Sequence, residues 1–493
     1  MDWREEYKSK LVSAEEAVRV VKSGDRVVLP LGNQTKVLGY KLFERSHELE
    51  NVEIVSGTAT NYGWFDPGYE KCFYPNIETY TGPGPRDMLL ERRGDFTPNI
   101  FGRMFKALDE GRPGVRPPDV VIVPLSTPDE HGYCSFGHDL WAKKDYIQRA
   151  KKRGKLVIGE VDDHLIRTFG DNFVPVSEID YFVDVTPQWP TPEEYQALLA
   201  KSPPELLDDY KLIFRVLDPG QVATRGELIM DTDPTYIKNL LGLGPPIEST
   251  KAISGYVSTL LRDGDVIQIG VGEVSTGMVK SGLFEGRYNL SLHTEIAPTD
   301  TAKMVDAGIF TGDSHPFHPG KIIATSFWPS ADQEDLAIVN GNPKFELHST
   351  TYVQTARNIM QIDNMVAINN ALIVDLAGQI GFETLPGFRL ENGPGGQIDF
   401  QIGAMYSRGG RAISLLPSTA MGGAVSRIVP LIEDGALVDI PRPLADFIVT
   451  EYGIASMQGK SQRQRAEELI AIAHPDFRAE LRKEAQRMLY PVS

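Results

Sequence analysis

The stretch that decides the fold is LRDGDVIQIGVG, residues 261–272, because residues 21–32, VKSGDRVVLPLG, repeat its pattern. Each stretch follows a predicted helix, turns at Gly-Asp, and continues as a short apolar strand that ends near a glycine. The two turn glycines, Gly24 and Gly264, lie about half of the chain apart. A period this long indicates duplicated domains, because the repeats of solenoids are only about 20–50 residues long. The alternative is that any two helix–turn–strand units of this kind look alike.

Both halves carry short apolar runs that alternate with helical stretches. The runs of the first half are residues 120–123, 155–158 and 181–185, and those of the second half are 365–368, 412–416 and 447–450. Continuous apolar runs between helices are typical of parallel sheets that are covered on both faces. The sequence therefore predicts an α/β fold of two duplicated open-sheet domains, residues 1–230 and 231–493.

Two further segments differ from this pattern in composition. Residues 187–246 are rich in proline, charge and helix-forming residues, so we expect an inter-domain tether with an inserted helical segment. Residues 461–489 read as a charged amphipathic helix that is interrupted at His474-Pro475-Asp476 and turns its polar faces to solvent.

Charge and composition exclude several classes of protein. The 493 residues include 50 Lys and Arg against 67 Asp and Glu, a formal charge of −17, which disfavours binding to nucleic acids or anionic membranes. No apolar run is long enough for a membrane span, and the charged residues 1–7 do not resemble a signal peptide. Two cysteines, Cys72 and Cys134, are too few for a disulfide framework or a four-thiolate metal site. We expect a cytoplasmic protein.

The first candidate binding loop is Gly270-Val271-Gly272, between a predicted strand and a predicted helix. A dinucleotide fingerprint would need a third glycine at position 275, which is Ser275, so that motif is absent. A strand, a glycine turn and a helix still make a cradle for anions, because backbone amides and the helix N-terminus point to the same place.

The second candidate loop, Asn392-Gly393-Pro394-Gly395-Gly396-Gln397, has three glycines in four positions. Glycines let a ligand approach the backbone closely and leave amides free to donate hydrogen bonds. A plain mobile turn is the alternative.

A metal site is not expected. His315-Pro316-Phe317-His318, with Asp300 and Asp313 nearby, lacks the helical spacing of paired ligands, so a loop packed by its own side chains is favoured. The sequence also contains no Gly-x-Ser-x-Gly elbow, no Walker A loop and no His-Glu-x-x-His motif.

Without an activated serine or cysteine, the nucleophile could be a carboxylate. A free glutamate has a pKa of about 4.3 and needs no base at neutral pH. The glutamates beside loops are Glu273, Glu295, Glu383, Glu391 and Glu451. Glu295 is best placed, because LHTE (residues 292–295) ends a predicted strand and the carboxyl ends of parallel strands form binding sites. A solvated surface glutamate is the alternative.

Nearly the whole chain resembles the acetyl-CoA hydrolase/CoA-transferase group, the family I CoA-transferases, especially the 4-hydroxybutyrate and butyrate types. The matching stretches are KSKLV (8–12), PDEHGYCSFG (128–137), LHTE (292–295), HPGK (318–321), DNMVAIN (363–369), VDL (374–376), GGQIDF (395–400), LPSTA (416–420) and VTEYG (449–453). Together these motifs are highly specific.

The resemblance implies an acyl-CoA:carboxylate CoA-transferase with two α/β domains of the CoA-transferase type. It implies that Glu295 is catalytic and forms a glutamyl-CoA thioester in a ping-pong reaction. Coenzyme A would be a substrate and not a tightly bound cofactor, small carboxylates would be the other substrates, and the chain would form a homodimer or higher homo-oligomer. The residues implied around coenzyme A are Gly270, Val271, Gly272, Glu273, Val274, Asn392, Gly395 and Gly396.

Some positions depart from the family pattern. Residues 32–36 replace a small-residue loop, Val274-Ser275 stands where Ile-Pro is common, and residues 352–355 lack an asparagine that is often found there. The tether is also longer than usual. These departures leave the acyl group open, and an acyl-CoA hydrolase or a non-enzymatic acyl-CoA-binding protein remain the alternatives.

The repeat makes one further prediction. Continued past the strands, it aligns Gly57 with Glu295. Because glycine cannot form an anhydride, we expect one reaction centre per chain.

Overall fold

The computed structural model describes residues 2–57, 60–78, 83–186, 191–217, 222, 226, 229–230, 233–240, 243, 248–327 and 333–490. The chain groups into two compact units. The first comprises residues 1–99, 103–243 and 324–351, and the second comprises residues 100–102, 244–323 and 352–493. The predicted domain boundary at residues 230 and 231 stays a prediction, and much of the predicted tether lies outside the described residues.

The first unit is built on a parallel sheet of seven strands in the order β10-β7-β5-β1-β2-β3-β4. The strands are β1 (Arg26–Leu29), β2 (Val52–Ser56), β3 (Phe73–Ile77), β4 (Asp95–Phe96), β5 (Val120–Leu125), β7 (Leu156–Val161) and β10 (Tyr181–Asp184). A separate short pair is formed by β6 (Tyr133–Ser135) and β9 (Phe173–Pro175). The short strands β8 (Phe169–Gly170) and β14 (Phe345–Leu347) pair in parallel at the end of the strand order β12-β13-β14-β8.

The helices of the first unit lie before, between and after these strands along the chain. They are α1 (Trp3–Lys10), α2 (Ala14–Val18), α3 (Leu38–Phe43), α4 (Pro83–Leu90), α5 (Lys106–Asp109), α6 (Lys143–Lys152), α7 (Pro192–Leu199), α8 (Leu207–Val216), α10 (Pro234–Leu240) and α14 (Gln333–Val339). Of these, α7, α8 and α10 fall in the segment predicted as a tether with inserted helices.

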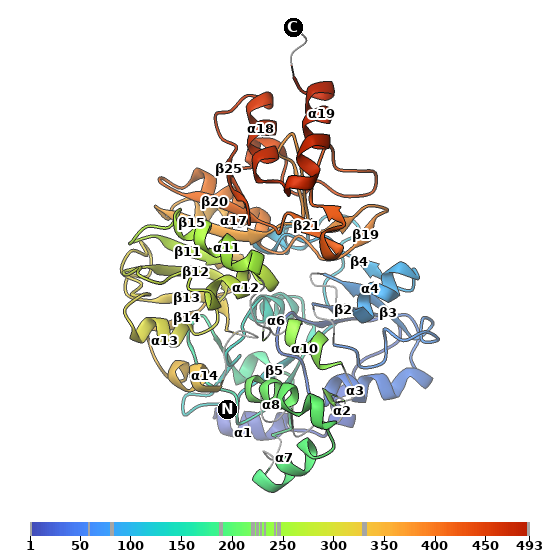
Figure 1. The fold of residues 1–493 in the computed structure, drawn as a ribbon. Coiled ribbons are helices and arrows are strands. Elements are labelled where there is room, and N and C mark those ends of the chain that lie inside the picture. The colour runs from blue at the N-terminus through green and yellow to red at the C-terminus, as the bar shows by residue number, and fades with distance from the viewer. Residues whose placement is uncertain are drawn as a thin grey trace. The chain divides into compact units, whose positions relative to one another are not determined.

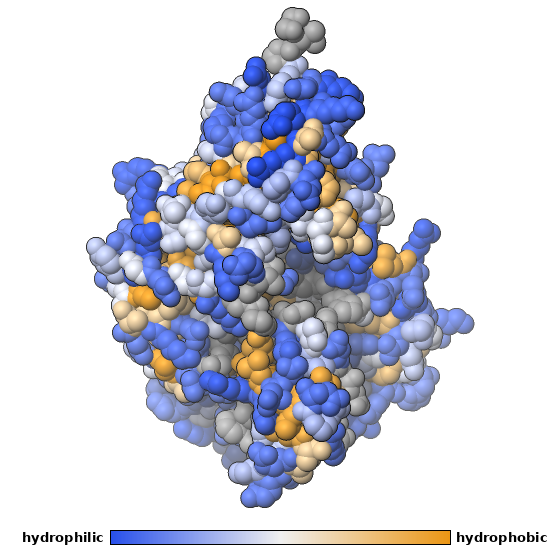
Figure 2. All heavy atoms as spheres, viewed as in Figure 1, coloured by the Kyte–Doolittle hydropathy of each residue, from blue (hydrophilic) through white to orange (hydrophobic). Residues whose placement is uncertain are grey.

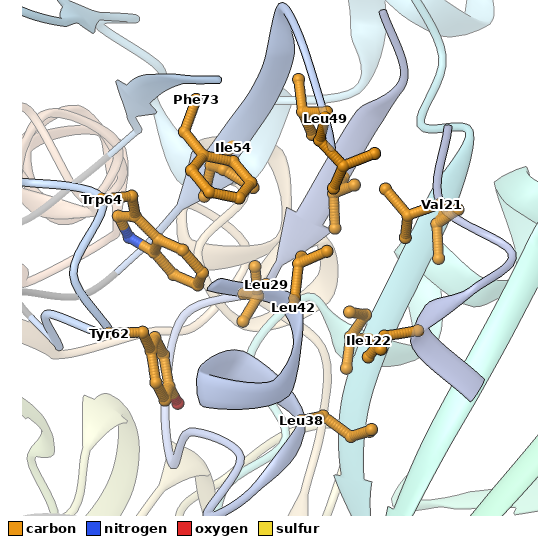
Figure 3. Packing of buried hydrophobic residues seen from close by; sticks show 14 of the residues in the cluster. Val21, Leu29, Leu38, Leu42, Leu49, Ile54, Tyr62, Trp64, Phe73 and Ile122 are labelled. Atoms are coloured by element: carbon orange, nitrogen blue, oxygen red, sulfur yellow. The ribbon is translucent and has the colours of Figure 1, made fainter. Parts of the chain in front are cut away.

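The core of the first unit lies between this sheet and its helices. Figure 3 shows Ile54 of β2, Phe73 of β3 and Trp64 packed together, and the Trp64 and Phe73 ring centroids are 6.1 Å apart. Leu38 and Leu42, on one face of α3, complete this layer and are fully buried. Burial on both sides explains why the strands are continuous apolar runs and do not alternate.

The second unit repeats this plan. Six strands run in the order β25-β24-β20-β15-β11-β12, all parallel except the hairpin β24–β25 (Figure 1). They are β11 (Val266–Ile269), β12 (Ser291–Ile296), β15 (Met365–Asn370), β20 (Arg411–Leu415), β24 (Phe447–Thr450) and β25 (Gly453–Ser456). The predicted α/β fold class is confirmed.

The helices of the second unit are α11 (Glu248–Ser258), α12 (Glu273–Lys280), α13 (Thr301–Asp306), α16 (Ala356–Ile359), α17 (Gln397–Tyr406), α18 (Gln462–Ile472) and α19 (Arg478–Met488). The unit also contains seven described short strands, which are β16 (Ile373–Asp375), β17 (Ile380–Gly381), β18 (Thr384–Leu385), β19 (Arg389–Leu390), β21 (Thr419–Ala420), β22 (Val425–Ser426) and β23 (Ile428–Val429). Two elements, β13 (Ile322–Ser326) and α15 (Thr350–Val353), each contain residues of both units.

The C-terminal segment has the predicted form of a helix with a break. Residues between α18 and α19 form a short turn at Pro475–Phe477. Leu469, Ile470 and Leu481 are buried, whereas the surface over both helices is mostly hydrophilic (Figure 2). Among the described residues, no helix combines the length and the apolar character that crossing a membrane requires.

The repeated turn has the same geometry in both units. Gly24 and Gly264 have φ angles of 83° and 82°, a left-handed conformation that favours glycine. In each turn the following aspartate accepts a hydrogen bond from the backbone three residues earlier: Lys22 N to Asp25 Oδ2 at 2.8 Å, and Arg262 N to Asp265 Oδ2 at 2.7 Å. The two halves therefore repeat in structure as well as in sequence.

We predict that Gly264→Ala lowers the free energy of unfolding by about 1 kcal/mol, because an L-residue is strained at this φ although a Cβ has room. Gly255→Ala is the matched control. Gly255 is exposed within α11 with open space around it, so alanine there raises stability by about 0.5–1 kcal/mol. Thermal unfolding of both variants measures the two shifts, and a loss of stability in both would contradict the turn assignment.

Candidate active site

Glu295 lies near the carboxyl end of β12 and is 8% exposed. Side chains alternate along a strand, so His293 and Glu295 point to one face of the sheet and Thr294 to the other. The Thr294 hydroxyl donates to the Ile296 carbonyl at 3.1 Å. Glu295 is thus held in a buried strand and is not a solvated surface residue.

The second glycine loop ends directly against Glu295. Gly396 is the residue before α17, and a Cβ atom built on it would lie 2.8 Å from Glu295 Oε2. The same Cβ would lie 2.2 Å from Gln354 Oε1. Two predicted site elements that are far apart in sequence therefore meet, and the backbone of the loop faces the Glu295 carboxylate. Asn392 lies at the other end of this loop, where its amide donates to the Glu383 carbonyl at 3.1 Å.

Gln354 is a candidate functional residue that sequence reasoning missed. Its side chain is fully buried, yet neither its amide nitrogen nor its amide oxygen has a hydrogen-bond partner among the described residues. Leaving both atoms of a buried amide unpaired is costly, so such a group suggests a ligand-binding role. The sequence marked this position only as a departure from the family pattern.

The first glycine loop leads from β11 into α12 and is held by two asparagines at the end of β15. A Cβ at Gly270 would lie 2.6 Å from Asn369 Oδ1, and one at Gly272 would lie 2.6 Å from Asn370 Nδ2. Asn370 Nδ2 donates to the Val271 carbonyl at 3.1 Å. Val271 and Glu273 are exposed, whereas Val274 is buried.

Asn370 also connects the two glycine loops. Its side chain holds the first loop, and its carbonyl oxygen accepts a hydrogen bond from Gln397 Nε2, beside Gly396, at 3.0 Å. Because β11 and β12 are parallel neighbours, the first loop and Glu295 lie at the same edge of the sheet. The structure thus brings together Glu295 and both predicted loops.

A segment distant in sequence also contacts this site. The Phe101 amide donates to the Gly395 carbonyl at 3.1 Å, and the Gly102 amide donates to Asp399 Oδ2 at 3.1 Å. Sequence reasoning missed this segment, because nothing in residues 100–102 distinguishes it from an ordinary loop.

The other candidate glutamates bond elsewhere. Glu451 accepts hydrogen bonds from the Ser418 amide and hydroxyl, and Glu391 forms an ion pair with Arg389. Glu273 is the exposed first residue of α12.

The histidines that were weighed as metal ligands bond to protein atoms. His315 Nε2 lies 2.9 Å from His293 Nδ1, and His318 Nε2 lies 2.7 Å from the Tyr352 hydroxyl.

Comparison with known proteins supports the family resemblance. The models of the acetyl-CoA hydrolase/transferase N-terminal and C-terminal domains match residues 1–192 and 333–485. The 4-hydroxybutyrate coenzyme A transferase of Clostridium kluyveri is 35% identical over 490 residues, which cover 99% of this chain and 100% of that protein. The succinyl-CoA:cyclohexane-1-carboxylate CoA transferase of Geobacter metallireducens is 31% identical, over 99% of this chain and 97% of the relative.

Solved structures agree with these matches. RipA from Yersinia pestis has a TM-score of 0.77 at 26% identity, with 99% of both chains covered. The 4-hydroxybutyrate CoA-transferase from Porphyromonas gingivalis has a TM-score of 0.70 at 27% identity, with 99% of this chain and 100% of that chain covered. The chain belongs to the acetyl-CoA hydrolase/transferase family.

Proposed function

We propose that the protein is an acyl-CoA:carboxylate CoA-transferase of the 4-hydroxybutyrate, butyrate or acetate type, with Glu295 as its nucleophile. The observation that carries this proposal is the Glu295 carboxylate against the backbone of Gly396, with the unpartnered amide of Gln354 beside it. The names of the relatives support the reaction class.

In the proposed reaction, Glu295 attacks the acyl-CoA thioester, which forms a mixed anhydride and releases CoA thiolate. The thiolate then attacks the glutamyl carbonyl, which releases the first carboxylate and leaves a glutamyl-CoA thioester. A second carboxylate reverses both steps and leaves as the new acyl-CoA. Thiols ionise near pH 8.5, so the thiolate is a competent leaving group and needs no general acid.

The residues around Glu295 suit the charges that develop in these steps. Each attack creates a tetrahedral oxyanion next to Glu295. We assign the donors for this oxyanion to the buried, unpaired amide of Gln354 and to the backbone of the Gly396 loop, and a donor of this kind contributes a few kcal/mol. Because these donors are already fixed, little reorganisation is needed during the reaction.

The two repeats differ in how the helix that follows the glycine turn begins. In the first unit, the Glu160 carboxylate accepts hydrogen bonds from the amides of Val37 and Leu38 at 3.1 and 2.8 Å, and so occupies the start of α3. In the second unit, α12 follows Gly272, which has no side chain to cap it. We therefore place the anionic coenzyme A at Gly270, Val271, Gly272, Glu273 and Val274, together with Asn392, Gly395 and Gly396.

Glu383 is a poor competitor as nucleophile because it is protonated at neutral pH. Burial and the neighbouring Asp439 carboxylate raise the pKa of Glu383 to about 8. Asp439 Oδ2 in turn accepts a hydrogen bond from the Glu383 amide at 2.9 Å. The Cys134 thiol is also unsuited, since burial raises its pKa to about 12.

The alternative on the same fold is an acyl-CoA hydrolase, in which water replaces the second carboxylate. Release of free CoA from acetyl-CoA, measured with and without a panel of carboxylates, separates the two. A transferase forms more of the new acyl-CoA as the concentration of the acceptor carboxylate rises. Release of free CoA at the same rate with and without every carboxylate would favour the hydrolase. A cytoplasmic location and a homodimer remain part of the proposal.

We predict that Glu295→Gln lowers transfer by at least about 1000-fold without unfolding the protein, because only the carboxylate forms the anhydride. Intact-mass measurement after incubation of the wild type with acyl-CoA is expected to show at most one covalent CoA per chain, on the Glu295 peptide. Full activity of the variant, two adducts, or an adduct in the first half would contradict the assignment.

We predict that Gly396→Ala lowers kcat by at least about 100-fold, because the added Cβ would overlap Gln354 Oε1 and crowd Glu295. Backbone strain is not the cause, since φ at Gly396 is −96°. Steady-state kinetics measure the effect, with Gly255→Ala as the control for the same substitution at an unrelated site. Near-normal turnover of Gly396→Ala would place this loop outside the active site.

The raised pKa of Glu383 makes the free energy of unfolding depend on pH. A free glutamate has a pKa of about 4.3, so the folded state binds more protons than the unfolded state between that pH and about 8. The contribution of Glu383 to stability is therefore complete at low pH and is lost as the pH rises toward 8. Because glutamine does not titrate, we expect Glu383→Gln to gain melting temperature relative to wild type by more than about 2 °C between pH 5.5 and 8.5. The exposed Glu433→Gln is the control, and parallel curves for all three proteins would contradict the pairing.

A further inference from the structure

Two buried histidines form a hydrogen-bonded pair, and one of them, His293, lies on the same strand as Glu295. His293 is 0% exposed and His315 is 1% exposed. His293 Nδ1 lies 2.9 Å from His315 Nε2, and His293 Nε2 lies 2.7 Å from the Val353 carbonyl oxygen. The proposed reaction assigns no role to either ring.

The partners of the two rings determine their tautomers. The Val353 carbonyl can only accept, so His293 carries its proton on Nε2 and accepts at Nδ1. His315 must then donate from Nε2 and accept at Nδ1. Its surroundings agree, because the amides of Phe317 and His318 point at His315 Nδ1 from 3.3 and 3.1 Å. All four ring nitrogens are satisfied only when both rings are neutral, and an added proton would set two N–H groups against each other.

These hydrogen bonds connect the segments that carry Gln354 and Glu295. Val353 directly precedes Gln354, so fixing its carbonyl fixes the backbone that carries the Gln354 amide. His293 lies two residues before Glu295 on the same face of β12. The Phe400 ring of α17 packs edge-on against His293, with centroids 6.4 Å apart, and closes the remaining side. The pair therefore links the strand of Glu295 to the segment of Gln354.

We propose that His293 and His315 are positioning residues that hold the Gln354 amide beside the Glu295 carboxylate. They do so through hydrogen bonds that require both rings to be the neutral Nε2–H tautomer. This inference rests on the proposed role of Glu295 as nucleophile. Neither polar side-chain atom of Gln354 has a hydrogen-bond partner among the described residues, so the placement of the amide depends on the backbone that carries it. When the hydrogen bond from His315 is removed, His293 can adopt its other tautomer. Its hydrogen bond to the Val353 carbonyl is then lost, and Gln354 no longer faces the reacting carboxylate.

The test compares variants of His315. His315→Phe keeps an aromatic ring, of somewhat larger volume, but removes both nitrogens, and we expect kcat to fall by about 10–100-fold while KM for acetyl-CoA stays within about threefold. His315→Gln restores a donor at the position of Nε2 and is expected to recover most of the rate. His474→Phe is the matched control, because His474 caps a surface turn and lies outside the described site.

A double-mutant cycle tests whether the pair acts through Gln354. Gln354→Leu is expected to lower kcat by about 10–100-fold, and adding His315→Phe is expected to lower it by less than about threefold more. Normal kcat in either single variant, or equal losses from His315→Phe in both backgrounds, would overturn the proposal.

A third measurement needs no folded His315→Phe protein. Nitrogen-15 histidine spectra of the wild type, assigned with His315→Gln, are expected to show both rings as the neutral Nε2–H tautomer at pH 7, and an Nδ1–H or charged ring would overturn the proposal.

The intact-mass experiment distinguishes failure of the proposed function from failure of the positioning role. If no adduct forms on Glu295, the proposed function fails; if it forms but the His315 variants are normal, only the positioning role fails.

Discussion

The site depends on the absence of a side chain at position 396. A single Cβ there would lie within 2.8 Å of Glu295 and 2.2 Å of Gln354, so only glycine allows the loop backbone to approach the carboxylate. That approach lets α17 begin beside Glu295, and it aligns the loop with Asn370 through Gln397. The first glycine loop is tied to the same asparagine. A steric constraint at one residue thus sets the geometry of the whole candidate site.

The same kind of constraint explains why the duplicated halves are not equivalent. Gly57 occupies the place in the first repeat that Glu295 occupies in the second. A Cβ at Gly57 would lie 2.6 Å from the Leu31 backbone, so a glutamate side chain has no room there. The helix after the first glycine turn is capped internally by Glu160, whereas the helix after the second is not. The first repeat thus caps this helix with a carboxylate of its own, whereas Gly272 supplies no side-chain cap to α12.

Buried polar groups mark the candidate site as strongly as the glycines do. Most buried polar atoms in proteins are paired, and the cost of an unpaired one falls on stability. Other buried polar side chains on β11, β12 and β15 have hydrogen-bond partners. Gln268 and Asn369 exchange two hydrogen bonds at 2.9 and 3.0 Å, and both ring nitrogens of His293 have partners. Both polar side-chain atoms of Gln354 are unpaired among the described residues, as is Asn370 Oδ1, and Gln354 lies where the proposed chemistry needs a donor.

The sequence alone determined the α/β class, the duplicated Gly-Asp turns and most strands of both sheets, and it predicted three elements of the candidate site: Glu295 at a strand end and the two glycine loops. These features are local, because strand periodicity, positive φ and the need for a bare backbone each leave a mark within a few residues. Only the tertiary structure placed Gln354, Asn370, Phe101 and the His293–His315 pair at the site. Their roles depend on contacts between segments far apart in the chain, and a glutamine, an asparagine or a histidine carries no local pattern that distinguishes such a contact from an ordinary surface position.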